Sequence, residues 1–471
     1  MTHAPFNSAA PRKQIPFRSF RPSAFCFLLT FLLAGFSIAA ETPAFPLRVS
    51  TNHRHLVDQK DRPFFYHADT AWMLFLKLTA SEAAEYLAAR KAQGFSVIQV
   101  QLTGFLGATT RADELPFAPP MYDFAEPNEG FFAHVDKVVA EAERQGLVLA
   151  MTPAWSGCCA EGWAGQTKDK QPAPLNTNGP EKARALGKWI GTRYAKFSNV
   201  MWIMGGDNDP DNAREPIRQL ALGIKEAAPA QLMTYHAAST HSSTDVWPAD
   251  ESWLEVSMVY TYFRGFNKAW KREQPDVYEV SHAEFAKSPT RPFFLGESTY
   301  EGEHGDWGSA LQARKQAYWC VLGGGCGHAY GSPNWNFPEN WREVLKLPGA
   351  ASLKHLRTLL EAREWWTLVP DVKNEFVVTG HGESQSNNLA TAARTAARTA
   401  DGRSLLAYLP GPRTLTVDLA KMTGKPLVAS WFNPRTGEST KIGEFTEKQR
   451  TEFHPRGEGD WVLVIETATT P

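Results

Sequence analysis

The stretch Val200–Asp207, which reads Val-Met-Trp-Ile-Met-Gly-Gly-Asp, decides the fold class. Its first five residues are apolar, with no alternation between apolar and polar side chains. This pattern is typical of a strand in a parallel sheet that is buried on both faces. Two glycines and a carboxylate follow directly, so the strand ends on a polar side chain. The stretch therefore predicts one βα unit of an α/β protein.

Seven further strands are predicted on either side of this one, because apolar runs alternate with helical patterns from residue 63 onward. In chain order they are Phe64–His67, Ser96–Leu102, Leu147–Thr152, Leu232–His236, Val256–Tyr260, Pro292–Leu295 and Gly327–Tyr330. Helices are expected over residues 81–93, 131–145, 180–196, 213–228, 276–287, 308–321 and 350–365. Eight such units predict a (β/α)8 TIM barrel, whose active site lies at the carboxyl ends of the strands.

An open, doubly wound sheet is the alternative α/β fold. That fold normally carries a glycine-rich phosphate-binding loop after its first strand. Here the first strand leads into His67–Trp72, which reads His-Ala-Asp-Thr-Ala-Trp and contains no glycine. The barrel is therefore preferred. Before it, residues 47–62 are expected to form a hairpin.

The first forty residues are predicted to be a secretory signal peptide. Basic residues precede the apolar segment Phe25–Ala34, and small residues follow it at 37–40. The apolar segment is shorter than the roughly 20 residues that a membrane-spanning helix needs. A single membrane anchor is the alternative, but we expect no membrane span after signal removal and a periplasmic or extracellular location.

A second, β-rich domain is predicted after about residue 370. Short runs separated by turn residues indicate a small antiparallel β-sandwich. These runs are Glu375–Thr379, Ser404–Leu409, Thr414–Asp418, Leu427–Phe432 and Trp461–Glu466. The low-complexity tract Thr391–Thr399 is expected to be a solvated loop. The predicted domains are thus a signal peptide at 1–40, a catalytic barrel at 41–370 and a β-sandwich at 371–471.

The composition excludes several classes of protein. The 471 residues are 43% hydrophobic and 12% aromatic, which is enough for a large core and excludes a mostly disordered chain. The net charge of -1 lacks the basic excess of a nucleic-acid-binding protein. Sixteen Trp and 12 Tyr offer flat faces that can stack on sugar rings, although most of them should fill the core.

Four cysteines follow the predicted signal peptide, namely Cys158, Cys159, Cys320 and Cys326. In an exported protein they can pair. Cys320 and Cys326 are close enough in sequence to bridge, whereas a bond between the adjacent Cys158 and Cys159 is not easily formed. The sequence leaves the pairing open.

Two carboxylates follow apolar strands that end in glycine. Asp207 follows the fourth predicted strand, and Glu297 ends the run Phe-Phe-Leu-Gly-Glu of the seventh. Two carboxylates that face one pocket suit glycoside hydrolysis, in which one protonates the leaving oxygen and the other attacks the anomeric carbon or activates water. Each carboxylate could instead be a structural cap or an ion-pair partner. For catalysis, Asp207 should have a raised pKa, and a separation of about 5–5.5 Å would indicate retention of configuration, which we favour over inversion.

Other chemistries lack their sequence motifs. The chain has neither a His-Glu-x-x-His zinc motif nor a Gly-x-Ser-x-Gly nucleophile elbow. The pair His53 and His55 precedes the barrel in a polar hairpin, so it is not taken as a metal site. A weaker alternative is an ion site among Glu301, Glu303, His304 and Asp306. No metal site and no cofactor are therefore predicted.

Several of these motifs together resemble one family. Phe64–Trp72, Gly94–Gln99, Gly205–Asp207 and Gly296–Glu301 are similar to the apiosidase-like glycoside hydrolases, family 140. The resemblance covers about residues 45–370, and the tail resembles the small β-sandwich named as a collagen-binding domain that often accompanies this barrel. It implies action on apiose linkages in the pectin rhamnogalacturonan II, with Asp207 as general acid/base and Glu297 as nucleophile.

One position departs from the wider group of such barrels. Many carry Asn directly before the acid of the fourth strand, where it holds the 2-hydroxyl of the sugar. Here that position is Gly206, so another residue must hold this hydroxyl.

The remaining candidates are polar or aromatic residues near the predicted strand ends and in the loops that follow. They would bind an oligosaccharide or polysaccharide substrate through hydroxyl contacts or stacking, and packing within the barrel is the competing role for the aromatic ones. The predicted substrate-binding residues are Asp69, Trp72, Gln101, Trp155, His236, Tyr260, Tyr300, Tyr330 and Trp335. The expected protein is an exported glycoside hydrolase with a short, crater-like site.

Three alternatives remain open. A glycosidase with a different sugar specificity would keep the mechanism. A non-catalytic carbohydrate-binding or surface-attachment protein would not bring Asp207 and Glu297 together, and would expose Trp431 and Trp461 as an aromatic platform. A protease that acts on collagen is supported only by the name of the tail domain. The sequence does not determine the oligomeric state.

Overall fold

The computed structural model describes residues 42–110, 114–262, 276–382 and 395–468, together with the backbone of the short pair β10 (Phe266–Asn267) and β11 (Arg272–Glu273). The predicted signal peptide lies outside the described residues. From Thr42 onward the chain forms one compact unit.

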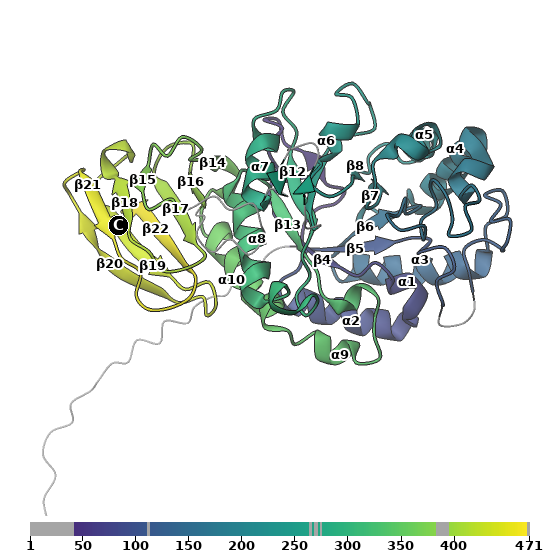
Figure 1. Ribbon diagram of the computed structural model, residues 1–471, viewed down its shortest axis with the longest axis horizontal. Helices are drawn as coiled ribbons and strands as arrows, with labels where there is room; N and C mark the ends of the chain where they lie inside the picture. Colours follow the sequence, from purple (N-terminus) through teal and green to yellow (C-terminus); the bar gives the residue numbers. More distant parts are fainter. Residues whose placement is uncertain are drawn as a thin grey trace, which may run out of the picture. The chain divides into compact units, whose positions relative to one another are not determined.

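Eight parallel strands form the predicted barrel (Figure 1). They are β4 (Tyr66–Thr70), β5 (Val97–Gln101), β6 (Val148–Thr152), β7 (Val200–Gly205), β8 (Met233–His236), β9 (Ser257–Thr261), β12 (Phe293–Ser298) and β13 (Gly327–Tyr330). Each coincides with a predicted strand to within a few residues. Every strand lies beside its neighbours in chain order, and β13 pairs with β4. The (β/α)8 fold is therefore confirmed.

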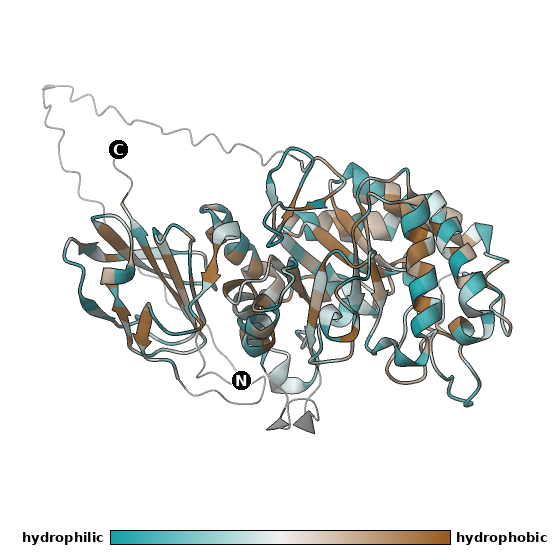
Figure 2. Ribbon diagram, turned by 90° about the horizontal axis from the view of Figure 1, so that it is seen from above, coloured by the Kyte–Doolittle hydropathy of each residue, from teal (hydrophilic) through white to brown (hydrophobic). Residues whose placement is uncertain are grey.

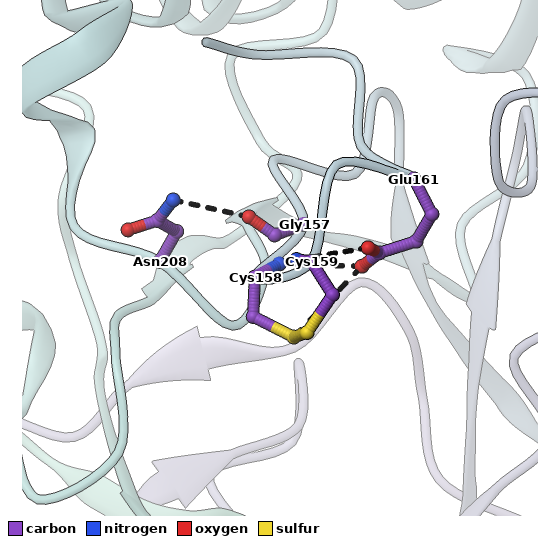
Figure 3. Close-up of a disulfide and its surroundings, with 5 residues drawn as sticks. All are labelled: Gly157, Cys158, Cys159, Glu161 and Asn208. Atoms are coloured by element: carbon purple, nitrogen blue, oxygen red, sulfur yellow. Dashed lines mark hydrogen bonds between the residues drawn. A yellow bond between two sulfur atoms is a disulfide. The ribbon is translucent and has the colours of Figure 1, made fainter. Parts of the chain in front are cut away.

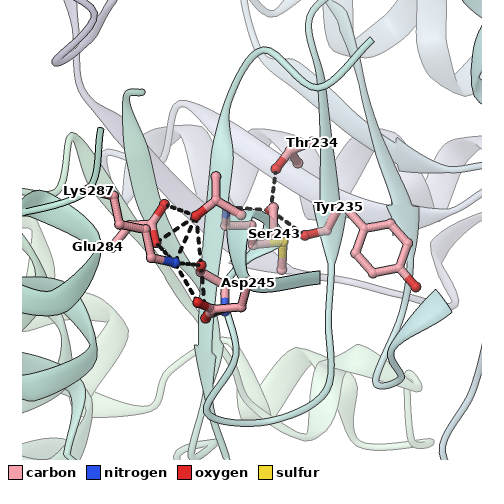
Figure 4. A network of polar contacts seen from close by, with 9 residues as sticks. Thr234, Tyr235, Ser243, Asp245, Glu284 and Lys287 are labelled. Atoms are coloured by element: carbon pink, nitrogen blue, oxygen red, sulfur yellow. Dashed lines mark hydrogen bonds and ion pairs between the residues drawn. The ribbon is translucent and has the colours of Figure 1, made fainter. Parts of the chain in front are cut away.

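The barrel closes between β8 and β9 through a side chain as well as the backbone. Ser243, on the short helix α6 (Ser243–Val246), donates from its hydroxyl to the Tyr235 carbonyl of β8 at 2.6 Å and accepts from the Met258 N–H of β9 at 2.8 Å (Figure 4). Below this bridge, the N–H of Val256 donates to the Met233 carbonyl at 3.2 Å. Ser243 is fully buried, so its hydroxyl satisfies backbone groups that water cannot reach.

Helices cover the outside of the barrel. The longer ones are α2 (Ala80–Ala92), α3 (Glu129–Arg144), α4 (Pro174–Tyr194), α5 (Arg214–Ala227), α7 (Val277–Phe285), α8 (Ala310–Leu322) and α10 (Pro348–Glu361), and the short ones include α1 (Leu74–Lys77) and α9 (Trp341–Val344). Helix α2 begins at a capping box of Thr79 and Glu82, as the sequence indicated for Thr79. Each helix turns an apolar stripe toward the strands, so Figure 2 shows brown and teal on the same ribbon.

A three-stranded antiparallel sheet precedes the barrel. Its strands are β1 (Arg48–Val49), β2 (Leu56–Val57) and β3 (Pro63–Phe64). The pair β1–β2 is the hairpin expected over residues 47–62. Leu56 is fully buried and belongs to the barrel core, so the hairpin is anchored to the barrel by packing.

The C-terminal region folds into two antiparallel sheets, as predicted. The first has the order β14 (Val369–Pro370), β16 (Thr395–Arg398), β17 (Ser404–Leu409), β22 (Trp461–Thr467), β19 (Leu427–Phe432) and β20 (Ser439–Phe445). The second contains β15 (Val377–Thr379), β18 (Leu415–Asp418) and β21 (Arg450–Phe453). Both sheets contribute to one buried cluster, for example through Leu405 of the first and Val417 of the second.

The prediction that Thr391–Thr399 is a solvated loop is wrong for its described part. Thr395–Arg398 is strand β16, which pairs with β14 on one side and β17 on the other. Ala396 and Ala397 are buried there. Small side chains fit between packed layers, and the repetitive composition hid the strand. Residues 391–394 lie outside the described part of the chain.

Helix α8 of the barrel packs against the first C-terminal sheet. The guanidinium of Arg314 donates to the carboxylate of Asp460 at 2.7 and 3.0 Å, and both side chains are buried. The ring of Tyr318 stacks on that of Tyr408, with centroids 4.5 Å apart. In the described ranges no helix has the length and apolar character that a membrane crossing requires.

Candidate active site

Asp207 follows the carboxyl end of β7, in a backbone turn that the two preceding glycines make possible. Gly205, Gly206 and Asp207 all have positive φ, at 79°, 129° and 52°. A left-handed conformation is costly for a residue with a side chain and recurs at functional sites. The two glycines are required sterically, since a Cβ on Gly205 would strike the Tyr235 ring and one on Gly206 the Trp155 ring. The turn thereby directs Asp207 across the barrel mouth.

Glu297 is held from two sides at the end of β12. Nε2 of His236 donates to one carboxylate oxygen at 2.6 Å, and the hydroxyl of Tyr300 donates to the other. The indole N–H of Trp72 in turn donates to the Tyr300 oxygen at 2.9 Å. A register shift in β12 next to Gly296 places Glu297 beside Tyr260 of β9. These contacts fix a carboxylate that is only 6% exposed.

The two carboxylates converge. One donor atom each from Asp207, His236 and Glu297 lie within 4.8 Å of one another. Burial, and next the negative charge of Glu297, raises the pKa of Asp207 to about 7, while the hydroxyl of Tyr260 acts in the opposite direction. Burial lowers the pKa of His236, but its hydrogen bond to Glu297 and the charges of both carboxylates outweigh burial, so the net shift is upward.

Aromatic side chains wall one side of these carboxylates. The Trp155 ring lies against Gly206 and next to Trp72, with centroids 5.0 Å apart. Phe105 continues this wall, 6.1 Å from Trp155 and 5.9 Å from Trp335. Trp335 is only partly buried, and its indole N–H donates to Glu303 at 2.8 Å. The wall thus joins the loops after β4, β5, β6 and β13.

Three polar side chains around this mouth have buried atoms without a hydrogen-bond partner in the described part of the chain. They are Nε1 of Trp155, Oδ1 of Asp207, and both the amide oxygen and nitrogen of Gln101 at the end of β5. An unsatisfied buried polar group costs about 1–3 kcal/mol, so a ligand that offers hydroxyls to these atoms would gain that free energy. Their position at the carboxyl ends of three neighbouring strands indicates a binding site for a ligand with many hydroxyls.

Comparison with known proteins agrees with this geometry. Residues 50–367 match the family model "Apiosidase-like, catalytic domain", and residues 376–466 match "Putative collagen-binding domain of a collagenase". The chain belongs to the apiosidase-like family. This membership makes it a glycoside hydrolase.

Solved structures show the same fold. A glycoside hydrolase family 5 structure from Bacteroides vulgatus ATCC 8482 is 24% identical, with a TM-score of 0.78 over 89% of this chain and 93% of that one. A structure titled "Glycoside hydrolase" is also 24% identical, with a TM-score of 0.76 over 91% and 98% of the two chains. No curated protein matches the chain.

Two predicted binding residues lie elsewhere in the apiosidase-like barrel. The carboxylate of Asp69 accepts hydrogen bonds from Arg90, at 2.8 Å, and from Tyr86, both on α2, so it faces the helices. Tyr330 donates to Glu301 at 2.6 Å and lies near Arg90. Both occupy the outer face of the barrel wall, because alternate residues of a strand point to opposite faces. We do not retain them as sugar-binding residues.

His236, Tyr300 and Trp72 reach the site, but with a role that differs from the predicted one. Their polar atoms hold Glu297 or one another, so they position the carboxylate. Tyr260 lies between the groups, with its ring 4.8 Å from that of His236. Gln101, Trp155 and Trp335 remain as candidates for direct contact with sugar. The sequence analysis did not single out Phe105, whose only signal was its place in a bulky loop after the second barrel strand.

The cysteines pair in the manner that the sequence disfavoured. Cys158 and Cys159 form a disulfide between adjacent residues, and Cys320 and Cys326 are free and buried. The suggested bridge between Cys320 and Cys326 is therefore wrong. Both thiols fill the core near β12 and β13, where burial raises the pKa of Cys320 to about 12.

Two groups of described side chains have donor atoms close enough to share a metal ion. One is Asp207, His236 and Glu297, and the other is Cys158, Cys159 and Glu161. In the first, His236 and Glu297 are hydrogen-bonded to each other, and in the second the sulfurs are bonded to each other. The sequence analysis also considered an ion site in the loop that contains Glu301 and Glu303. There, Glu301 accepts hydrogen bonds from Tyr330 and from the N–H of Gly349, and Glu303 accepts from Trp335 and Tyr262.

Proposed function

We propose that this apiosidase-like protein is a retaining glycoside hydrolase in which Asp207 is the general acid/base and Glu297 the nucleophile. The observation that carries the proposal is the short distance between the two carboxylates, since one oxygen of Asp207 and one of Glu297 lie within 4.8 Å of each other. Retaining enzymes have carboxyl groups about 5–5.5 Å apart, whereas inverting enzymes leave about 6.5–9.5 Å for a water molecule.

The first step uses the environments of both groups. An oxygen of Glu297 attacks the anomeric carbon, the bond from that carbon to the leaving oxygen breaks, and the proton of Asp207 passes to the leaving oxygen. Asp207 is suited to this because its pKa of about 7 leaves much of it protonated near neutral pH. Tyr300 and His236 keep the Glu297 carboxylate aimed.

The second step reverses the role of Asp207. Its carboxylate takes a proton from water, the water oxygen attacks the anomeric carbon, and the bond to Glu297 breaks. Once Glu297 is esterified it carries no charge. Burial of Asp207 remains, but the part of its raised pKa that comes from the charge of Glu297 is then gone, so the pKa falls and Asp207 can lose its proton and act as the base.

The proposed substrate class is an apiose-containing pectic glycan, cut at or near its end. Support comes from the family description and from the aromatic wall of Trp72, Phe105 and Trp335, which closes one side of the site. A closed wall suits a short crater that holds a terminal sugar. The free indole N–H of Trp155 is the proposed donor to the 2-hydroxyl, since its ring occupies the space above Gly206 that an Asn side chain would need.

The proposal also includes export of the protein and weighs against a purely binding function. The basic and apolar character of residues 1–40 supports secretion to the periplasm or the exterior, where pectic fragments are met. A non-catalytic binding protein is not favoured, because Asp207 and Glu297 converge. Of the two tail tryptophans, Trp431 is only 2% exposed and Trp461 is partly buried against it, so Trp431 does not contribute to an exposed platform.

A panel of pectic oligosaccharides and aryl glycosides, apiosides included, tests the proposal. Wild-type protein should release apiose, and Asp207→Asn and Glu297→Gln should each lower kcat on the oligosaccharides by roughly 10²–10⁴-fold. Asp211→Asn is the matched control, because this neighbour has a side chain that is 77% exposed and forms an ion pair with Arg214. Release of another sugar would overturn the specificity, and full activity in either site variant would overturn the site.

A further inference from the structure

The disulfide between Cys158 and Cys159 lies on the loop after β6, at the same end of the barrel as the carboxylates (Figure 3). Both residues are exposed. Cysteine is among the most buried residue types, and a disulfide carries no hydrogen-bond donor that water would satisfy. The bond thus presents a small apolar surface to solvent at the rim of a site lined by unpartnered polar groups.

The loop is fastened directly to the segment that carries Asp207. The N–H of Gly157 donates to the Gly206 carbonyl at 3.0 Å, and the side chain of Asn208 donates back to the Gly157 carbonyl at 3.0 Å. These bonds engage the residues on both sides of Asp207. The disulfide, which starts one residue after Gly157, is therefore held in a fixed position beside the proposed acid.

A second set of contacts fixes the shape of the loop. Glu161 accepts hydrogen bonds from the N–H groups of Cys158, at 3.2 Å, and Cys159, at 2.9 Å. Its carbonyl accepts from the N–H of Leu106, which follows Phe105 of the aromatic wall. In Figure 3, Glu161 and Asn208 lie on opposite sides of the disulfide.

We infer that the Cys158–Cys159 disulfide forms the apolar wall of the subsite for the leaving-group sugar, and packs against the C–H face of that ring. This inference rests on the proposed function. The acid must reach the oxygen that joins the two sugars. The loop with the exposed disulfide is hydrogen-bonded to the residues on both sides of this acid, so we take its exposed surface to face the sugar beyond that oxygen. Sulfur is polarisable and makes favourable dispersion contacts with apolar faces.

The test compares two substrates with the same cleaved sugar. A glycosyl fluoride has no leaving-group sugar, whereas an oligosaccharide with one sugar on the leaving side does. In the double variant Cys158→Ser/Cys159→Ser, the loss of kcat/KM on the oligosaccharide should exceed the loss on the fluoride by about 5- to 30-fold, the size expected for uncovering one apolar sugar face. The loss should be mainly in KM. Equal losses on the two substrates would overturn the inference.

Reduction of the wild-type protein gives a second measurement that needs no variant to fold. Of the described cysteines, only Cys158 and Cys159 are bonded, so a thiol reductant should act at this site and reproduce the change in the oligosaccharide-to-fluoride ratio. The double variant should not respond. A reductant effect of the same size in the double variant would contradict the assignment. Hydrolysis of the fluoride reports separately on the proposed function, because it depends on Glu297 and not on the leaving-group subsite.

Discussion

Nε2 of His236 donates a hydrogen bond of 2.6 Å to Oε2 of Glu297. On the other side of the same ring, Nδ1 lies 3.2 Å from the backbone N of Asp207 and 3.0 Å from the carbonyl oxygen of Ala237. One buried imidazole thus links the segments that carry both proposed catalytic carboxylates. Its place between β7 and β12 explains why the two groups keep a short separation across the mouth of the barrel.

The link through His236 predicts a loss of rate with little loss of substrate affinity. His236→Asn should lower kcat by about 10- to 100-fold, since a hydrogen bond to a charged group contributes about 1.5–3 kcal/mol. KM should change by less than about 3-fold, because the ring does not contact sugar in this account. Steady-state kinetics separate the two parameters. A variant with raised KM and unchanged kcat would instead place His236 in direct substrate contact.

The pKa of Asp207 predicts the basic limb of the pH profile. As pH rises through about 7, the acid loses its proton, so kcat/KM on an oligosaccharide should fall with a midpoint near this value. The raised pKa also means that ionised Asp207 destabilises the fold, an effect that grows from the ordinary Asp pKa up to about 7. Asp207→Asn should therefore remove this limb and raise Tm at pH 8 but not at pH 3. A limb that persists unchanged in Asp207→Asn would assign the titration to another group.

The indole N–H of Trp155, which has no partner among the described residues, predicts an effect on activity beyond the effect on stability. Trp155→Phe should lower kcat/KM by roughly 10-fold, the effect of one lost hydrogen bond to substrate, beside the fall in Tm that shortening a buried ring causes. Trp163→Phe is the matched control, because its buried N–H already donates to the Gly104 carbonyl at 2.7 Å. That control should lower Tm and spare kcat/KM. Equal kcat/KM in Trp155→Phe and wild type would remove Trp155 from the binding site.

The bridge made by Ser243 predicts a stability effect at the closure of the barrel. Ser243→Ala leaves the Met258 N–H without its acceptor, which should lower the free energy of unfolding by about 1–3 kcal/mol. The exposed Ser252 provides the control, and Ser252→Ala should change it by less than about 0.5 kcal/mol. Denaturant unfolding measures both variants. Equal stability of Ser243→Ala and wild type would show that the backbone contacts alone close the barrel.

The ion pair between Arg314 and Asp460 predicts coupling of the barrel to the C-terminal sheets. Asp460→Ala leaves a buried guanidinium unpaired and should cost about 3–5 kcal/mol. Glu444→Ala removes the exposed pair with Lys441 and should leave Tm nearly unchanged, because solvent screens an exposed pair. Calorimetry of both variants is the measurement. If the C-terminal region alone melted at a lower temperature in Asp460→Ala while the barrel kept its Tm, the ion pair would not stabilise the barrel.

The strands and the two carboxylates could be predicted because they depend on local patterns. A strand such as Val200–Gly205 is buried on both faces, so its apolar run is unbroken, and the residue after it must lie at the carboxyl end of the barrel. This placed Asp207 and Glu297 on one rim. The raised pKa of Asp207 follows from the same convergence, since a second carboxylate near a buried one favours its protonated form.

The direction of individual side chains could not be predicted in the same way. Asp69 lies at a strand end like Asp207, but a shift of one residue along a strand exchanges the inner and outer faces. Its partners Tyr86 and Arg90 lie in the following helix, and the sequence does not show that contact. The Cys158–Cys159 disulfide could not be predicted because it depends on the local backbone of a loop. Strand β16 was missed because it lies in a repetitive segment whose small residues resemble those of a linker.

The most direct test of the two-carboxylate mechanism is to locate the covalent intermediate. An activated aryl glycoside that the wild-type protein hydrolyses is chosen as the substrate. The protein is mixed with this substrate, the reaction is quenched with acid during the steady state, and the peptides of the protein are mapped by mass spectrometry. The account predicts one sugar residue attached to the peptide that contains Glu297, and no adduct in Glu297→Gln. A sugar on any other carboxylate, or release of product with inverted anomeric configuration and no adduct, would contradict it.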